Sequence, residues 1–235
     1  MAAMSQFPST RGSLIAAAAG LTPGTRAALA ELCKLYWPPA YAFVRRSGRS
    51  PDDALDLTQS FFARVLEHND LASFDPRRGR FRSWLLGALK HVLANERRHA
   101  AAQRRGGGVD MLSIDAVDAE HRYAREPADR LTPERAYERR WALTVLERVL
   151  GRLEQEQAAQ GKHERFERLK GFLVGDEPSY EALADQLGEA AGTLRVQAHR
   201  LRRRYRDLLR EEIADTVEGP ADVDDELRHL LAALS

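Results

Sequence analysis

The stretch PSYEALADQLGEAAGTLRVQAHRLRRRYR, residues 178–206, predicts two helices joined by a tight turn. In the shorter first helix Ser179 can serve as the N-cap, and Gly188 can end the helix in a left-handed conformation. The longer second helix repeats apolar residues at spacings of four and three, at Leu194, Ala198, Leu201, Tyr205 and Leu208. This spacing places them on one side of a helix, so that side is expected to face a core.

The other sides of the second helix are strongly basic. Six arginines lie between residues 195 and 206, and the first acid after them is Asp207. One interpretation is a solvated basic face, which is common for runs of charge. The short helix and the tight turn ahead of it favour a helix-turn-helix, whose second helix enters the major groove of DNA. We expect groove contacts from Thr193, Arg195, Val196, His199 and Arg200. We expect phosphate contacts from Arg202, Arg203, Arg204 and Arg206.

The whole chain has an ordinary composition but an uneven distribution of charge. Of its 235 residues, 43% are hydrophobic and 30% are charged, which is typical of a soluble protein, and the length suits two small domains. The formal net charge is only +1, yet basic residues gather at 76–105 and 195–210 and acidic residues at 52–56 and 110–129. Nucleic-acid binding is therefore predicted from two basic segments and not from the total charge.

Several features argue against an enzyme and against a membrane or oxidising location. The seven histidines lie apart, and the sequence has no cysteine cluster, phosphate-binding glycine loop or nucleophile elbow. We expect no catalytic residues, no metal, no cofactor and no small-molecule substrate. The single cysteine, Cys33, suits a reducing compartment. The apolar run at 12–21 is too short to span a bilayer, so we expect a cytoplasmic protein without membrane insertion.

Ala, Leu, Arg and Glu at helical periods predict an all-α protein, because alternating β-branched segments are almost absent. We expect N-terminal helices over 25–47, interrupted or kinked at Pro38 and Pro39, over 51–68 and over 81–105. Three glycines and scattered acids after residue 105 indicate a flexible linker whose acids are solvated or thread a basic channel. The predicted divisions are an N-terminal extension (1–23), a first domain (24–106), a linker (107–131), a second domain (132–213) and a C-terminal amphipathic extension (214–235).

Two helices of the first domain carry contrasting surfaces. The helix from Pro51 begins with acids that favour the positive end of the helix dipole. The segment 76–108 is basic apart from Glu96, and its cations alternate with aromatic and aliphatic residues. Aromatic side chains beside cations suit single-stranded DNA, although Trp84 falls on the apolar side, where core packing is favoured.

Three segments together resemble bacterial sigma factors of the extracytoplasmic-function group in the sigma-70 superfamily. They are PDDALDLTQSFFARVLEH (51–68), FDPRRGRFRSWLLGALKHVLANERRHAAAQRR (74–105) and SYEALADQLGEAAGTLRVQAHRLRRRYRDLL (179–209). The resemblance implies a region 2 helical bundle and a region 4 helix-turn-helix joined by the linker. It also implies that core RNA polymerase and promoter DNA are the partners, and that the protein helps to open the duplex.

The resemblance assigns roles to residues at matching positions. Contacts to polymerase are expected from Asp52, Asp53, Asp56 and Gln59. Contacts to the downstream promoter element and to single-stranded DNA are expected from Arg80, Arg82, Lys90, His91, Asn95, Arg97 and Arg98. Contacts to the upstream element are expected from Thr193, Arg195, Val196, His199, Arg200, Arg203 and Arg204.

The sequence departs from the family pattern at two places. Where the family commonly has DAEDLTQE, this chain has DALDLTQS, so Leu55 and Ser60 replace acids. Phosphorylation of Thr58 or Ser60 would restore negative charge and switch polymerase binding on, and the alternative is that the remaining aspartates suffice. In the second motif Ala190 stands where a capping serine is common.

Some alternatives stay open. An autonomous helix-turn-helix regulator would have the same second motif, but it would need dimerisation or a ligand pocket. Control by an anti-sigma factor and control by a Ser/Thr kinase are both compatible with the sequence. The C-terminal extension can dock on the second domain or on a regulatory protein.

Overall fold

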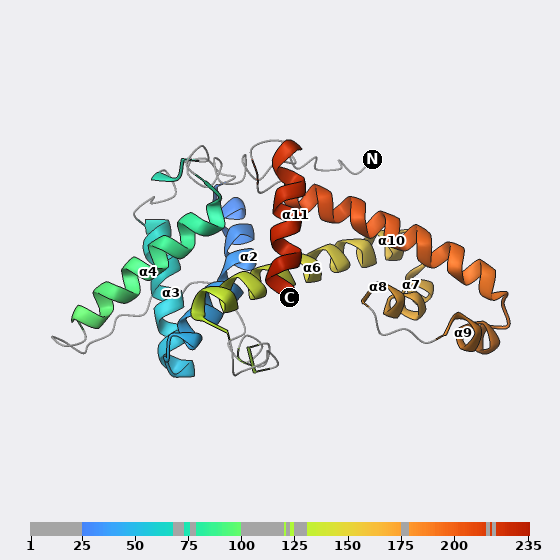
Figure 1. Ribbon diagram of the computed structural model, residues 1–235, viewed down its shortest axis with the longest axis horizontal. Coiled ribbons are helices and arrows are strands. Elements are labelled where there is room, and N and C mark those ends of the chain that lie inside the picture. The colour runs from blue at the N-terminus through green and yellow to red at the C-terminus, as the bar shows by residue number, and fades with distance from the viewer. Residues whose placement is uncertain are drawn as a thin grey trace. The chain divides into compact units, whose positions relative to one another are not determined.

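The computed structural model describes residues 25–67, 73–75, 79–99, 120, 123–124, 131–174, 179–214, 217 and 220–235. Within these ranges the chain forms helices and no β-strand, which confirms the predicted all-α class (Figure 1). The helices are α2 (Thr25–Arg46), α3 (Pro51–Glu67), α4 (Phe81–His99), α6 (Pro133–Ala159), α7 (His163–Leu169), α8 (Gly171–Val174), α9 (Tyr180–Leu187), α10 (Ala191–Ala214) and α11 (Pro220–Leu234). None of these described helices is long and apolar enough to cross a membrane. The predicted N-terminal extension and most of the predicted linker lie outside the described residues.

The chain divides into two compact units, Met1–Thr144 with Ala214–Ser235, and Val145–Ile213. The division falls inside α6, and α11 belongs to the first unit. From the sequence we expected 132–213 to form one domain and 214–235 to form a separate extension. The domain boundaries drawn from the sequence stay predictions.

The first unit is built on α2, which packs chiefly against α3 and also contacts α4. The helix runs through Pro38 and Pro39, so the expected interruption of α2 is wrong, while the alternative expectation of a kink there stays a prediction. Proline removes a helix hydrogen bond and clashes with the preceding turn. Burial on both sides of the prolines opposes that cost, since Leu35 and Ala40 are fully buried and the ring of Trp37 is buried and stacks on that of Tyr41.

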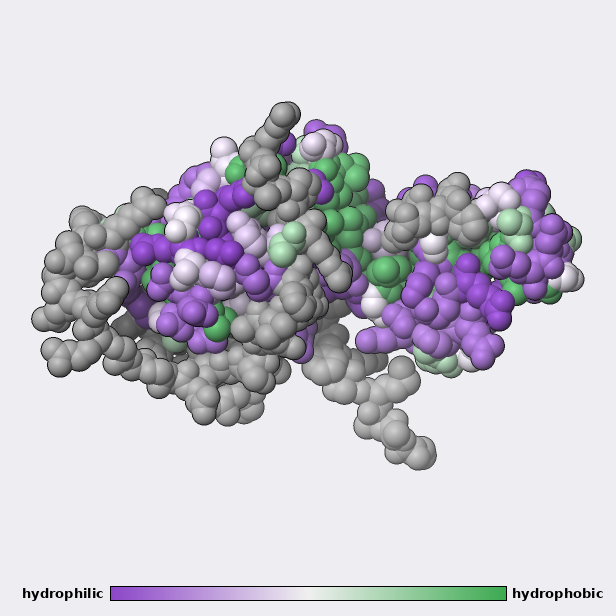
Figure 2. Space-filling view, turned by 90° about the horizontal axis from the view of Figure 1, so that it is seen from below, coloured by the Kyte–Doolittle hydropathy of each residue, from purple (hydrophilic) through white to green (hydrophobic). Residues whose placement is uncertain are grey.

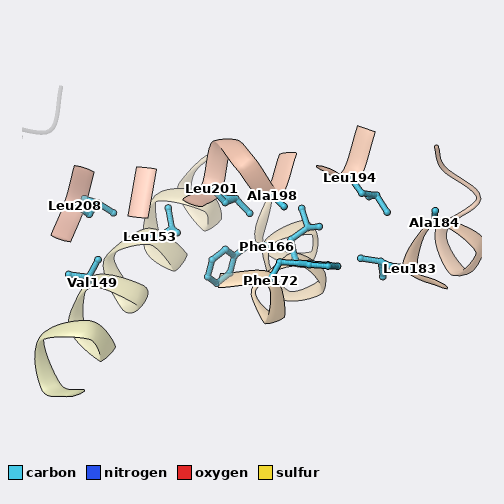
Figure 3. Packing of buried hydrophobic residues seen from close by; sticks show 11 residues of the cluster. Val149, Leu153, Phe166, Phe172, Leu183, Ala184, Leu194, Ala198, Leu201 and Leu208 are labelled. Atoms are coloured by element: carbon cyan, nitrogen blue, oxygen red, sulfur yellow. The ribbon is translucent and has the colours of Figure 1, made fainter. Parts of the chain in front are cut away.

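The second unit encloses an apolar cluster between the end of α6, the short helices α7 to α9 and the long helix α10 (Figure 3). The cluster contains Val149, Leu153, Phe166, Leu169, Phe172, Leu183, Ala184, Leu194, Ala198, Leu201 and Leu208. The four members from α10 belong to the predicted apolar face, and Tyr205, the fifth residue of that face, packs against the cluster from its edge. The α10 periodicity therefore predicted correctly which side of this helix is buried.

The starts of α9 and α10 differ in their caps: α9 has a side-chain N-cap, and α10 has none. The Ser179 hydroxyl accepts a hydrogen bond of 3.0 Å from the Ala182 N–H, which confirms the predicted N-cap of α9. Gly188 ends α9 with φ of 64°, the left-handed conformation expected for it. At the start of α10, Ala190 offers only its carbonyl, which accepts from the Thr193 N–H at 2.9 Å.

We expect opposite stability effects at these two helix starts. Ser179→Ala removes the side-chain acceptor and should lower the free energy of unfolding of the second unit by about 1 kcal/mol. Ala190→Ser adds an acceptor for the first N–H groups of α10 and should raise that free energy by up to about 1 kcal/mol. Urea denaturation followed by circular dichroism measures both changes. Equal midpoints for the two variants would contradict the cap assignments.

Candidate nucleic-acid interface

An acidic surface lies on α3. The helix begins at Pro51, and the Ser50 hydroxyl accepts a hydrogen bond of 3.1 Å from the Asp53 N–H. The predicted polymerase-binding residues of α3 are all exposed: Asp52, Asp53, Asp56 and Gln59. The opposite side of the helix holds Ala54, Phe61 and Val65 in the core of the first unit. The structure therefore brings the four predicted residues onto the solvent side of one helix.

The two predicted phosphorylation positions differ in accessibility. Thr58 is fully buried, and its hydroxyl donates a hydrogen bond of 2.7 Å to the Ala54 carbonyl. A kinase must reach the hydroxyl, so the burial of Thr58 contradicts its selection as a modification site. Ser60 is exposed and remains accessible. The sequence missed this difference because both residues are small and polar, and only packing decides which of them faces the core.

Two arginines predicted to contact DNA form ion pairs within the first unit. Arg82 at the start of α4 is only 4% exposed, although it was expected to contact DNA. Its Nη1 lies 3.3 Å from Glu138 Oε2 and 3.1 Å from Glu226 Oε1, and its guanidinium lies 4.5 Å from the centre of the Trp141 ring. Arg80 is more accessible, and its Nε lies 2.8 Å from Glu226 Oε2. The expectation of DNA contact therefore does not agree with the position of Arg82.

The remaining predicted residues of α4 lie further along the helix. Lys90 is exposed, and its Nζ lies 2.7 Å from Glu134 Oε1. The hydrogen bond from Lys90 lowers the pKa of the Glu134 carboxyl. Both partners are about half exposed, so this pair adds little to stability and leaves the cation close to solvent. His91 is exposed, and Asn95 Nδ2 lies 3.3 Å from its Nδ1. For Arg97 and Arg98 only the helical backbone is described.

A basic surface lies on α10 opposite its buried face. The predicted contact residues on this surface are exposed: Thr193, Arg195, Val196, His199, Arg200 and Arg203. Val196 is 52% exposed and places an apolar side chain among the polar and charged residues of this surface. Arg195 pairs with Glu181 of α9 and lies over the ring of Tyr180. Figure 2 shows a largely hydrophilic surface over the helices of the second unit.

Arg204 differs from the other predicted residues of α10. Its guanidinium lies 2.7 Å from Glu156 Oε1 of α6 and 3.1 Å from Glu211 Oε1. The hydrogen bond from Arg204 lowers the pKa of Glu156, and the same bond raises the pKa of Arg204. The side chain is 40% exposed, so it contacts solvent while it connects two helices of the second unit. The partner on α6, Glu156, was not visible in the local sequence of α10.

One acid of the predicted linker is not simply solvated. Glu120 Oε1 lies 2.8 Å from Arg45 Nη2, and its Oε2 accepts a hydrogen bond of 2.5 Å from the Tyr41 hydroxyl. The hydrogen bond from Arg45 lowers the pKa of Glu120. The guanidinium of Arg45 also lies 4.9 Å from the centre of the Tyr123 ring. These contacts attach part of the predicted linker to α2.

Among the described residues, one group has donor atoms close enough for a metal. The donor atoms of Glu154, His163 and Glu167 lie within 4.8 Å of one another. All three side chains are substantially exposed, and the Lys170 ammonium lies 2.6 Å from Glu167 Oε2. A cation already satisfies one of the carboxylates, so we base no metal site on this group.

Comparison with known proteins identifies the first of the two regions. Residues 32–103 match the family model described as Sigma-70 region 2. No curated protein matches the chain, and no solved structure matches it either. The matched residues include most of α2 and all of α3 and α4, and therefore both the acidic surface and the basic helix of the first unit. The chain thus contains a Sigma-70 region 2 domain, which supports a sigma factor of the sigma-70 family.

Proposed function

We propose that this protein is a transcription initiation factor of the extracytoplasmic-function group, which binds core RNA polymerase and directs it to specific promoters. The observation that carries the proposal is the region 2 match, because the matched residues include both the exposed acids of α3 and the basic residues of α4. In this role α3 binds a basic surface of polymerase through Asp52, Asp53, Asp56 and Gln59. We assign the protein no catalytic residue and place it in the cytoplasm, with polymerase and DNA.

The helix α4 would bind the downstream element while the duplex opens. Cations that follow a strand and aromatic rings that accept unstacked bases suit single-stranded DNA. Exposed Lys90 and His91 support this assignment, as does the partial exposure of Arg80. Arg82 is left out of the contact set because it is buried. Asn95, Arg97 and Arg98 remain in the set as predictions.

The pair α9–α10 would read the upstream element as a helix-turn-helix. Its support is the capped turn, the buried apolar side of α10 and the exposed residues on the other side. Thr193, Arg195, Val196, His199 and Arg200 lie toward the N-terminal part of α10, which is the part that meets base edges in this motif. Arg203 lies further along and would contact phosphate. Arg204 is a weaker candidate because Glu156 and Glu211 engage it.

Reconstituted transcription tests the proposal. Purified protein is mixed with bacterial core RNA polymerase, and run-off transcripts are measured from the DNA upstream of its own gene. A sigma factor produces promoter-dependent transcripts that core polymerase alone does not make. An autonomous helix-turn-helix regulator, the second candidate, would instead bind duplex DNA tightly without polymerase and as a dimer. Such binding together with no transcripts would replace the proposal by this alternative.

Two arginines of α10 provide a matched test of the upstream contact. Arg200→Ala removes an exposed side chain from the basic surface of α10. We expect the complex of this variant with core polymerase, the holoenzyme, to lose about 1–3 kcal/mol in promoter binding free energy. Arg204→Ala breaks contacts to Glu156 and Glu211 and should cost less than about 1 kcal/mol in unfolding free energy, with little change in promoter affinity. Promoter binding by both holoenzymes measures the difference. Equal losses of promoter affinity would contradict the proposed orientation of α10.

Control of this factor is a further part of the proposal. Ser60 is the accessible position for a Ser/Thr kinase, since Thr58 is buried. A phosphate on Ser60 would add about 1.5 to 2 negative charges to the side of α3 that carries Asp56. An anti-sigma factor that covers α3 would act at the same surface. Phosphopeptide mapping after incubation with a cell extract distinguishes the first mechanism from the second.

A further inference from the structure

The carboxylate of Glu226 on α11 lies between two arginines of the region 2 domain. Its Oε1 is 3.1 Å from Arg82 Nη1, and its Oε2 is 2.8 Å from Arg80 Nε. The Glu226 side chain is 2% exposed, and the Arg80 side chain is 28% exposed. Both arginines were expected to contact DNA, so a residue of the C-terminal extension occupies predicted nucleic-acid contacts in this conformation.

Two apolar side chains of α11 are also buried, and its C-terminal end contacts α6. Val223 and Leu230 are buried, and Arg139 Nη1 of α6 donates a hydrogen bond of 2.7 Å to the Leu234 carbonyl near the C-terminus. Apolar burial therefore holds the helix in place, and Glu226 is brought to the arginines by that packing. The placement of Glu226 is a consequence of helix docking and not of a chance surface ion pair.

The ionic contacts by themselves hold α11 weakly. Burial raises the pKa of Glu226 against the opposing effect of Arg82 and Arg80, which reflects the cost of removing the carboxylate from water. Among the described residues Arg82 Nε is buried without a hydrogen-bond partner. Desolvation of a buried ion pair commonly offsets most of its Coulomb attraction. Phosphate groups of DNA can therefore compete with Glu226 for the exposed side of this site.

We propose that α11 is an intramolecular competitor of nucleic-acid phosphate, with Glu226 occupying Arg80 until the helix is displaced. This inference rests on the proposed function, since it assigns Arg80 to the DNA surface of α4. Arg82 has a different role, because Glu138 and the Trp141 ring of α6 hold it whether or not α11 is docked. Arg82 positions the Glu226 carboxylate. Arg80 is the cation that becomes available to DNA phosphate when α11 is displaced. The protein binds single-stranded DNA more tightly once α11 has left.

The test compares Glu226→Gln with Asp222→Asn in the full-length chain. Both substitutions replace a carboxylate by an amide on α11, but Glu226 is buried and Asp222 is exposed. Fluorescence anisotropy of a labelled single-stranded oligonucleotide measures affinity, and hydrogen exchange of residues 220–234 measures docking of α11. We expect Glu226→Gln to exchange faster, because removing one partner of a buried ion pair leaves the other, Arg82, less compensated even where the intact pair adds little stability. We expect the variant to bind about fivefold to tenfold more tightly at about 50 mM salt, because one added phosphate contact raises the salt slope by about 0.7. Asp222→Asn should match the wild type.

Two further variants make the test specific. The double variant Glu226→Gln, Arg80→Ala should lose the gain in affinity, and a gain that persists would overturn the role of Arg80. Leu230→Ala loosens α11 while it keeps the carboxylate, so it should produce a similar gain even if the glutamine variant folds poorly. Faster exchange of α11 without any change in affinity or salt slope would falsify the competition.

Failure of this inference can be separated from failure of the proposed function. Suppose that the protein supports transcription with polymerase but that Glu226→Gln and Leu230→Ala bind DNA as the wild type does. This outcome overturns the role of α11 and leaves the sigma assignment intact. The opposite outcome has two parts. Glu226→Gln binds DNA more tightly and the Arg80 double variant loses that gain, but no transcripts appear with polymerase. This outcome overturns the sigma assignment and supports the masking of a nucleic-acid site by α11. The anisotropy assay contains no polymerase, which keeps the two conclusions independent.

Discussion

Thr58→Glu is expected to lower the free energy of unfolding of the first unit by about 3–5 kcal/mol, whereas Ser60→Glu changes it by no more than about 0.5 kcal/mol. Thr58 is fully buried, so the new carboxylate would be removed from water, which is costly for a charge. Ser60 is exposed, so the same charge there stays in water. Urea denaturation followed by near- and far-ultraviolet circular dichroism measures both variants.

Thr58→Val is the matched control for packing. It keeps the shape of the side chain and replaces by a methyl group only the hydroxyl that bonds to the Ala54 carbonyl. Its cost should be about 1 kcal/mol, far below that of Thr58→Glu. Equal stability of Thr58→Glu and Ser60→Glu would show that Thr58 is not in the core. The prediction also affects the switch hypothesis, because loss of polymerase binding by Thr58→Glu would report unfolding, and only Ser60→Glu can report the effect of added charge.

The second prediction concerns the acidic surface of α3. Replacing Asp52, Asp53 and Asp56 together by asparagine should weaken binding to core polymerase by about 10- to 100-fold, since complementary charge mainly controls the rate of association. The loss should shrink at high salt, because exposed charges are screened. Surface plasmon resonance with immobilised core polymerase measures the association rate at several salt concentrations. A variant with unchanged affinity would remove α3 from the polymerase interface.

Single substitutions separate this effect from helix stability. Asp52 and Asp53 lie in the first turn of α3, where a negative charge stabilises the helix by about 0.3–1 kcal/mol each. Asp56 lies beyond the first turn, so Asp56→Asn should reduce polymerase affinity with little change in unfolding free energy. Asp207→Asn on α10 removes an exposed carboxylate elsewhere and should leave polymerase affinity unchanged. If polymerase affinity fell only in those variants whose unfolding free energy also fell, the acids would have a merely structural role.

Local patterns predicted much of the helical structure. The Ser179 cap, the Gly188 turn and the buried side of α10 agree with the structure because each depends on residues within a few positions of one another. The exposed acids of α3 follow from the same kind of pattern. The continuous α2 is the exception, since burial of Leu35 and Ala40 opposes the local effect of Pro38 and Pro39.

The availability of individual polar residues was decided only by tertiary structure. Thr58 and Ser60 look alike in sequence, yet packing of the first unit buries one and leaves the other in solvent. The sequence around Arg82 predicts a DNA contact, but in the folded protein Arg82 pairs with Glu138 and Glu226, which lie on helices distant in sequence. The sequence by itself determined the all-α class and where basic and acidic residues gather, because these depend on short-range periodicity. The end of the predicted helix 81–105, after residue 99, lies outside the described residues. Only the tertiary structure decided which charges are already neutralised, because an ion pair depends on distance in space and on loss of water.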